Sequence, residues 1–243
     1  MTKIRWQVIF AVVLIVVSAM LFTAHFFIFH DAYDIFFYLF HGIAFIPIQV
    51  IIVGLIIDKI IEKKEKEKMM KKLNMVIGLF FSEVGHNFVE EVSKHDKNLE
   101  NSMELFRLNS SQSLKEMCEI KDKLKNYKGE LEIDIKTLVK VRDILLKKRD
   151  FLVKLIENPL LLDHDTFTEL LMAIFHISEE FVYRCDIENL SDEDVKHLAN
   201  DVVRAYNYIV IEWIVYIIYL KKEYPYLYNS AVLTNPFLKK PKN

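Results

Sequence analysis

Two long uncharged apolar stretches near the N-terminus constrain this chain more than any other feature. The first covers Trp6 to Phe29 and the second covers Ile35 to Ile57, and neither contains Asp, Glu, Lys or Arg. As helices of about 24 and 23 residues they would each be about 35 Å long, which is enough to cross a hydrocarbon core of about 30 Å. The pattern therefore predicts two membrane-spanning helices, at about residues 6–29 and 35–57.

The cations flanking these stretches predict the orientation. Only residues 30–34 separate the two predicted spans, so the helices should be antiparallel neighbours. Lys3 and Arg5 precede the first span, whereas residues 30–34 contain no Lys or Arg. A run of lysines follows the second span: Lys59, Lys63, Lys64, Lys66, Lys68, Lys71 and Lys72. Because Lys and Arg near helix ends are retained on the cytoplasmic side, we predict a two-span membrane protein with both termini in the cytoplasm.

A cleaved signal peptide is the alternative interpretation of residues 1–24. Its apolar segment would be longer than the usual length of about 7–15 residues. No clean cleavage site with small residues follows it either. Two spans therefore remain the preferred prediction.

Composition predicts an all-α protein. The chain has 5 Gly and 5 Pro in 243 residues, and its long Leu, Ile, Lys and Glu segments show no sustained alternation of period two. We expect a transmembrane hairpin at 1–57, a charged helical stalk at 58–74, a cytoplasmic α-helical domain at 75–237 and a tail at 238–243.

Charge and cysteine content narrow the possible partners. The formal net charge is −2, and the lysines alternate with glutamates, so a nucleic-acid partner is not expected. Cys118 and Cys185 lie far apart and form no CxxC pattern, so neither a disulfide framework nor a thiolate zinc site is indicated.

The expected domain is a series of amphipathic helices. Residues 75–92 should be helical, and residues 93–112 should be broken and polar. Capping boxes, in which a Ser or Thr is followed three residues later by Glu, begin at Ser113 and at Thr166. The predicted helices run from Ser113 to near Gly129, from Leu131 to Glu157, from Thr166 to about Cys185 and from the Ser191 cap to about Lys222.

Glu83 and His86 are spaced to project from one side of the predicted helix 75–92. A core-facing helix with a hydrogen-bonded His86 is the preferred interpretation. A Glu-x-x-His metal pair, as in di-iron helical bundles, is a second. A phosphoacceptor histidine is a third, because VGHNFVEEV at 84–92 resembles the dimerisation helix of sensor kinases. That resemblance lacks the acidic residue after the His and the later proline, and no glycine-rich nucleotide-binding module follows.

Two further polar positions lie on helices of the domain. Glu169, His176 and Glu180 form a stripe beside an apolar seam, either as a solvated edge or as a ligand or metal site. Glu212 lies in the middle of the apolar stretch 205–220, where a charge in a membrane costs about 2–3 kcal/mol or more. We therefore expect a helix buried in the domain, with a third span as the alternative. A buried Glu212 needs a partner, such as Tyr, His or Arg, or a raised pKa.

Three stretches of this sequence together resemble a known family. They are NMVIGLFFSEVG at 74–85, HLANDVVRAYNYIVIEW at 197–213 and EYPYLYNSAVLTNPF at 223–237. The family consists of prokaryotic two-span membrane proteins with a helical cytoplasmic domain, and it has no assigned activity. The resemblance covers about a quarter of the chain and implies the same topology, but it assigns no functional residue.

These observations leave three hypotheses for function. The preferred one is a membrane-anchored protein, held in the lipid bilayer as a homo-oligomer, that acts as a scaffold or sensor by binding a cytosolic protein. The second is a small oligomeric channel lined by polar residues in the spans: Ser18, Thr23, His25, His41 and Gln49. The third is a helical metalloprotein that uses Glu83, His86, His176, Glu180 and Glu212. We predict no catalytic residue and no cofactor, because the sequence has no phosphate loop, nucleophile constellation or complete metal set.

Overall fold

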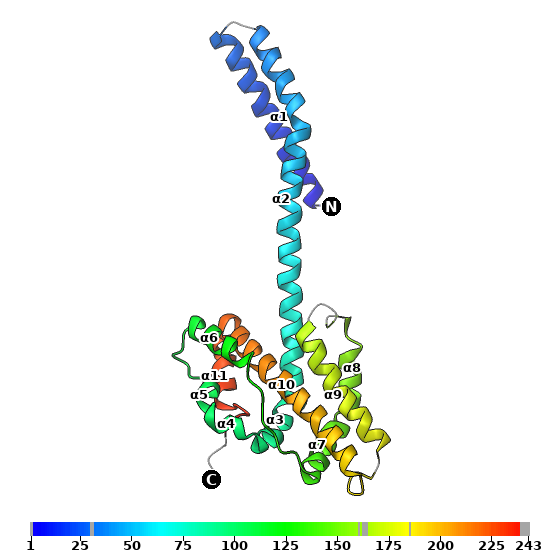
Figure 1. Cartoon of the computed structure of the whole chain (residues 1–243). Coiled ribbons are helices and arrows are strands. Elements are labelled where there is room, and N and C mark those ends of the chain that lie inside the picture. Colours follow the sequence, from blue (N-terminus) through cyan, green and yellow to red (C-terminus); the bar gives the residue numbers. More distant parts are fainter. Residues whose placement is uncertain (1, 30–31, 160, 162–164, 185, 239–243) are drawn as a thin grey trace. The chain divides into compact units, whose positions relative to one another are not determined.

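The computed structural model describes residues 2–29, 32–159, 161, 165–184 and 186–238 (Figure 1). Regular structure in these residues is helical, apart from one isolated antiparallel bridge between Asp96 and Leu131. The prediction of an all-α protein is therefore confirmed. The chain forms two compact units, Met1–Lys66 and Glu67–Asn243.

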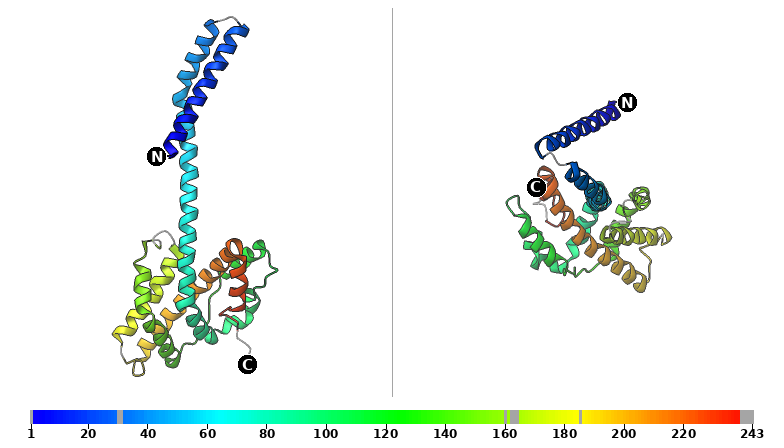
Figure 2. Two further views of the ribbon diagram at one scale, coloured as in Figure 1. Left: turned by 180° about the vertical axis from the view of Figure 1, so that it is seen from behind. Right: turned by 90° about the horizontal axis from the view of Figure 1, so that it is seen from above.

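The first unit contains α1 (Thr2–Phe29) and the first part of α2 (Ala32–Phe80). Figures 1 and 2 both show these helices running antiparallel. The apolar stretch Val8–Ile28 has no buried residue, and neither has the apolar window of the second helix, so most apolar side chains of these two stretches are exposed. Residues 30 and 31 of the predicted connection lie outside the described residues.

The second unit begins with the last part of α2, where the predicted helix 75–92 contains a change of helix type. After Phe80 the chain forms one π-helical turn, Phe81–Gly85, then α3 (His86–Val92) and a 3₁₀ turn, Ser93–His95. A π turn bonds each residue to the one five positions away and changes the direction of the side chains that follow it. The even helical spacing assumed for this stretch is therefore wrong at residues 81–85.

The polar segment 93–112 contains two short helices, α4 (Lys97–Asn101) and α5 (Met103–Phe106). Buried Asp96 holds this region to the loop before Leu131: its Oδ1 accepts hydrogen bonds from Asn98 N and Glu130 N, both at 3.0 Å. Its Oδ2 accepts one from the Tyr127 hydroxyl. Burial, and then this bond to Asp96, raise the pKa of Tyr127 well above its usual value.

The predicted capping box at Ser113 and Glu116 is confirmed, and it starts α6 (Leu114–Leu124). The next helix differs from the prediction of one helix over 131–157. Asp134 caps α7 (Ile135–Lys147) by accepting a hydrogen bond from Thr137 N at 2.8 Å, so residues 131–134 are not helical. Lys148 then interrupts the helix, with a ψ of 11°, before α8 (Arg149–Ile156).

The domain is completed by α9 (Asp165–Tyr183), α10 (Asp192–Glu223) and α11 (Pro225–Leu233). Thr166 lies inside α9, so the capping role predicted for it is wrong, and Cys185 lies outside the described residues. Ser191 caps α10 as predicted, because its Oγ accepts a hydrogen bond from Asp194 N.

Helix α10 lies at the centre of this unit. Figure 1 shows α7, α8 and α9 on one side of it and α4, α5, α6 and α11 on the other, and Figure 2 shows the same division from behind. This helix is buried in the domain, as predicted: Leu198, Val202, Ala205 and Ile209 are buried, and Val195 is half-buried. This burial places the apolar side of α10 inside the domain.

Candidate functional site

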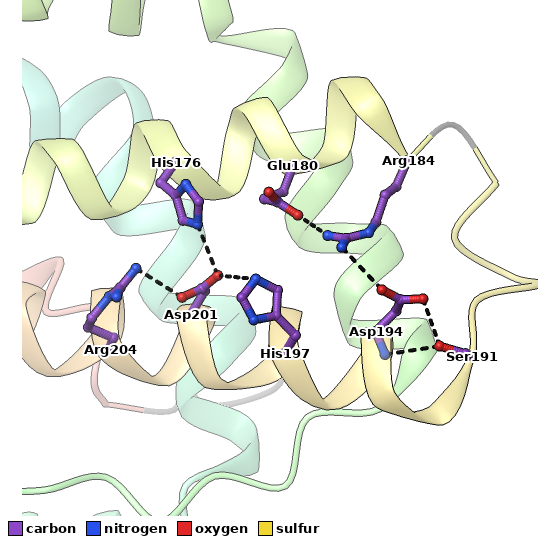
Figure 3. Close-up of polar contacts among 8 residues, drawn as sticks. All are labelled: His176, Glu180, Arg184, Ser191, Asp194, His197, Asp201 and Arg204. Carbon is purple, nitrogen blue, oxygen red and sulfur yellow. Dashed lines mark hydrogen bonds and ion pairs between the residues drawn. The ribbon is translucent and has the colours of Figure 1, made fainter.

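The polar groups most suited to chemistry lie between α9 and α10 (Figure 3). His176 on α9 and His197 on α10 both direct a ring nitrogen at the carboxylate of Asp201. Asp201 Oδ2 lies 3.3 Å from His176 Nε2 and 3.4 Å from His197 Nε2. One carboxylate oxygen therefore faces two imidazoles from two different helices.

Helical spacing places these three side chains together. His197 and Asp201 are four residues apart on α10, so they share one face of the helix. Their next neighbours Leu198 and Val202 are fully buried, which keeps the pair at the border between the core and solvent. On α9, Ile177 is buried in the same way beside His176.

The two oxygens of Asp201 have different surroundings. Arg204 Nη2 lies 2.9 Å from Oδ1, whereas Oδ2 is buried, faces the histidines and accepts no hydrogen bond from any residue that the structure describes. The Asp201 side chain is only 8% exposed, whereas the imidazoles of His176 and His197 are 45% and 52% exposed. A buried carboxylate oxygen next to two accessible imidazole nitrogens is an arrangement that can bind a cation.

A second polar group follows along the same helices (Figure 3). Glu180 pairs with Arg184, and Arg184 Nη2 lies 3.1 Å from Asp194 Oδ1. The Ser191 hydroxyl donates to Asp194 Oδ2 at 2.6 Å. This hydrogen bond first, and then Arg184, hold the pKa of the half-exposed Asp194 below its usual range. The group connects the end of α9 with the start of α10.

The structure gives the other predicted polar residues separate neighbours. Glu83 Oε2 accepts a hydrogen bond from Lys148 Nζ at 2.5 Å. The ring of His86 lies 6.1 Å from that of Phe81, and His86 also lines a small hollow with Asn235 and Pro236. Of the five residues considered for a metalloprotein, only His176 belongs to the cluster with His197 and Asp201.

Glu212 is buried, as the sequence predicted, with 1% of its surface exposed. Its Oε2 accepts a hydrogen bond from the Thr166 hydroxyl at 3.0 Å, which connects α10 to the start of α9. A threonine partner was not among those expected from the sequence. The same contact gives Thr166 a tertiary role in place of the predicted cap.

The polar residues considered for a channel lie on α1 and α2, where they are exposed or contact neighbouring residues of these two helices. The Thr23 hydroxyl donates to Ala19 O within α1 at 2.8 Å. His25 and Ser18 line a hollow of about 420 Å³ on the side of α1 that meets Tyr38 of α2. His41 and Gln49 are exposed on α2.

Sequence reasoning missed His197 and Asp201. A signal was present, because the stretch HLAND at 197–201 has His and Asp at the four-residue spacing that puts two ligands on one helix face. His176 could be assigned to the same site only once α9 was known to pack beside α10.

The fold and this cluster define an all-α protein with an N-terminal helical unit and a C-terminal helical domain that carries a polar site between its two longest helices. The chain belongs to the MJ1433 family: residues 2–61 match its N-terminal helical domain and residues 69–233 its C-terminal helical domain. It is 39% identical over 233 residues to "Uncharacterized protein MJ1433" of Methanocaldococcus jannaschii, covering 96% of this chain and 94% of that protein. No solved structure matches the chain. The family descriptions name helical domains and no activity.

Proposed function

We propose that this protein is anchored in the membrane by residues 6–29 and 35–57 and that its helical domain acts in the cytoplasm by binding other proteins. The observation that carries the proposal is the surface of the first unit. The long apolar stretches of α1 and α2 have no buried residue, and water is a poor environment for so much apolar surface. A lipid bilayer would cover it at a matching length.

Helix α10 supports two spans in preference to three. Among the described residues, three helical stretches, Val8–Ile28, Tyr33–His95 and Asp192–Glu223, are long and apolar enough to cross a membrane. Half of the apolar window in Asp192–Glu223 is buried inside the protein, including the seam around Ile209 and Trp213. Moving this helix into lipid would remove the centre of the C-terminal domain.

A role in protein binding is supported by the surface of α11. Tyr226, Leu227 and Leu233 are exposed on this helix, whereas Tyr228 between them is buried. Exposed aromatic and aliphatic side chains of this kind are common at protein interfaces. A membrane-anchored scaffold or sensor, assembled as a homo-oligomer, is the function that joins these features.

Reporter fusions test the topology. A reporter inserted at residue 32 should be active only outside the cytoplasm, and reporters at Lys64 and Asn243 should be active only inside. An external reporter signal at Asn243 would require a third span and would contradict the proposal. Fractionation of the full-length protein is the companion measurement, because release from membranes by alkaline carbonate would show that neither helix is integral.

Protein binding is tested separately with the full-length protein in nanodiscs. If the chain forms a homo-oligomer, the protein mass per nanodisc should be a whole-number multiple, two or more, of the 28.8 kDa of one chain. A cytosolic partner should be captured by the wild type and lost on the double substitution Tyr226→Ser and Leu233→Ser. A monomer that captures no partner would contradict the scaffold part of the proposal and leave the anchor unaffected.

A further inference from the structure

We propose that His176, His197 and Asp201 bind one divalent transition-metal ion, with Zn²⁺ as the ion that fits best. Two imidazole nitrogens and one carboxylate oxygen form a donor set that zinc uses in proteins. The inference rests on the α9 and α10 side chains alone, so it is independent of the membrane anchor and of any protein partner.

The distances between the donor atoms agree with those of a coordination sphere. Zinc binds His nitrogen and carboxylate oxygen at about 2.0–2.2 Å, so two ligands of a tetrahedral ion lie about 3.4 Å apart. Asp201 Oδ2 lies 3.3 Å from His176 Nε2 and 3.4 Å from His197 Nε2. One ring nitrogen of each histidine and a carboxylate oxygen of Asp201 all lie within 4.8 Å of one another. Two edges of the tetrahedron therefore already have the required length.

The third edge, between the two imidazoles, can close by rotation of exposed side chains. His176 and His197 are about half-exposed, and their rings are 6.5 Å apart between centroids, with an interplanar angle of 88°. A small change in their side-chain torsions would bring the Nε2 atoms closer while Asp201 stays fixed. The buried carboxylate thus supplies the rigid part of the site and the histidines the adaptable part.

Arg204 positions the carboxylate. Its guanidinium lies 2.9 Å from Oδ1, which leaves Oδ2 directed at the two nitrogens. Ligating carboxylates in metal sites are commonly held by such an outer partner. The cation also offsets part of the negative charge of Asp201, so we expect weaker binding than at a closed four-ligand zinc site. Three protein ligands leave one position for water or a small anion.

A bound ion would join α9 to α10, the two longest helices of the C-terminal domain. Because the unfolded chain does not hold these three ligands together, binding would stabilise the folded state. A thermal shift with the ion is therefore a readout that requires no knowledge of the protein's activity. The competing explanation is that the histidines only form ion pairs with Asp201 when they are protonated.

The test uses full-length protein in detergent, purified through a tag without histidine and stripped of metal. Zn²⁺ binding is measured by isothermal titration, and Co²⁺ binding by the visible absorption bands of a four-coordinate ion. We expect one equivalent per chain and a higher unfolding midpoint with Zn²⁺. His176→Ala, His197→Ala and Asp201→Asn should each weaken binding at least about tenfold. His41→Ala, which removes an imidazole from α2, is the matched control and should bind as the wild type does.

A folding control and two contradicting outcomes complete the test of metal binding. Asp201 is buried, so Asp201→Asn must first show the wild-type circular dichroism spectrum, and if it is unfolded the exposed His197→Gln replaces it. Wild-type protein that binds neither Zn²⁺ nor Co²⁺ would overturn the proposal and leave only the ion-pair explanation. Unchanged affinity in the His176 and His197 variants would overturn it as well, because the ion would then bind elsewhere.

Discussion

The hydroxyl oxygen of Tyr216 on α10 lies only 2.6 Å from the position that a Cβ atom at Gly78 would occupy on α2. The ring of Tyr216 also stacks on Phe81, with centroids 5.5 Å apart. The last part of α2 and the central helix of the domain can therefore approach this closely only because residue 78 has no side chain.

Gly78→Ala should destabilise the protein through this contact. Overpacking of this kind typically costs about 1–3 kcal/mol, although alanine is the better helix former. Tyr216→Phe removes the clashing oxygen, so Gly78→Ala should cost less in the Tyr216→Phe background. A double-mutant cycle on the free energy of unfolding measures the difference. Additive effects of the two substitutions would show that the contact is not formed.

The start of the second unit leads to a prediction about truncation. Leu73 is fully buried, and Lys71 Nζ lies 3.3 Å from Glu223 Oε2. A fragment that starts at Glu67 should therefore be helical and soluble, and more stable than one that starts at Asn74. Burial of one leucine contributes about 1.5–3 kcal/mol, and a solvent-screened ion pair adds little to this.

Urea unfolding followed by circular dichroism compares the two fragments. Within the longer fragment, Leu73→Ala should cost about 2–5 kcal/mol, whereas Lys72→Ala on the exposed side should change stability little. Aggregation of the fragment from Glu67 would mean that the domain needs the first unit in order to fold.

Glu91 gives a prediction for acid pH. Burial raises the pKa of this carboxyl group, but hydrogen bonds at 2.7 Å from Lys140 and from Lys94 outweigh burial and hold the pKa below its usual value. A carboxyl group with a lower pKa in the folded state contributes stability above its unfolded pKa of about 4.3. That contribution is lost as the pH falls through the folded pKa.

Lys140→Met should therefore reduce the loss of stability between about pH 5 and pH 3, because it brings the pKa of folded Glu91 closer to its unfolded value. The effect should be small, since Lys140 is largely exposed and water screens its charge. Thermal unfolding at several pH values measures it. Lys97→Met is the matched control, because its partner Glu132 is exposed on the surface, and it should leave the acid dependence unchanged.

Periodic patterns in the sequence predicted the parts of the fold that depend on local chemistry. The all-α class, the Ser113 and Ser191 caps and the burial of α10 in the domain all follow from side chains a few residues apart. The break at Lys148 and the π turn at 81–85 were not predicted, because packing against other helices decides them and the local sequence remains compatible with a continuous helix.

The candidate site also combines a part that local sequence predicts with a part that depends on packing between helices. The four-residue spacing of His197 and Asp201 predicts that they share one face of a helix. Their partner His176 comes from another helix, so the cluster depends on how α9 packs against α10. Thr166 illustrates the opposite error. Its capping pattern with Glu169 is genuine in sequence, yet its hydroxyl contacts Glu212, which is 46 residues away.

The contact between Thr166 and Glu212 leads to the last prediction. Glu212→Gln keeps an oxygen that can accept the Thr166 hydroxyl and nearly the same volume, so it should change stability by less than about 1 kcal/mol. Glu212→Ala removes the acceptor and leaves a cavity in the core, so it should cost about 2–4 kcal/mol. Thr166→Val removes the donor with little change of shape and should cost about 1 kcal/mol in wild type and less in the Glu212→Ala background.

Thermal and urea unfolding of these variants show whether the buried Glu212 side chain needs its negative charge or only a hydrogen-bond acceptor. A glutamine that costs as much as alanine would indicate an ionised carboxylate whose charge is needed by its surroundings, because an amide would then be a poor replacement. A tolerated glutamine indicates that hydrogen bonding alone is required. Glu193→Ala, at an exposed position in the first turn of α10, is the control and should change stability little. If Glu212→Ala were as stable as this control, Glu212 would have to be solvated, and the packing of α10 at the centre of the domain would be wrong.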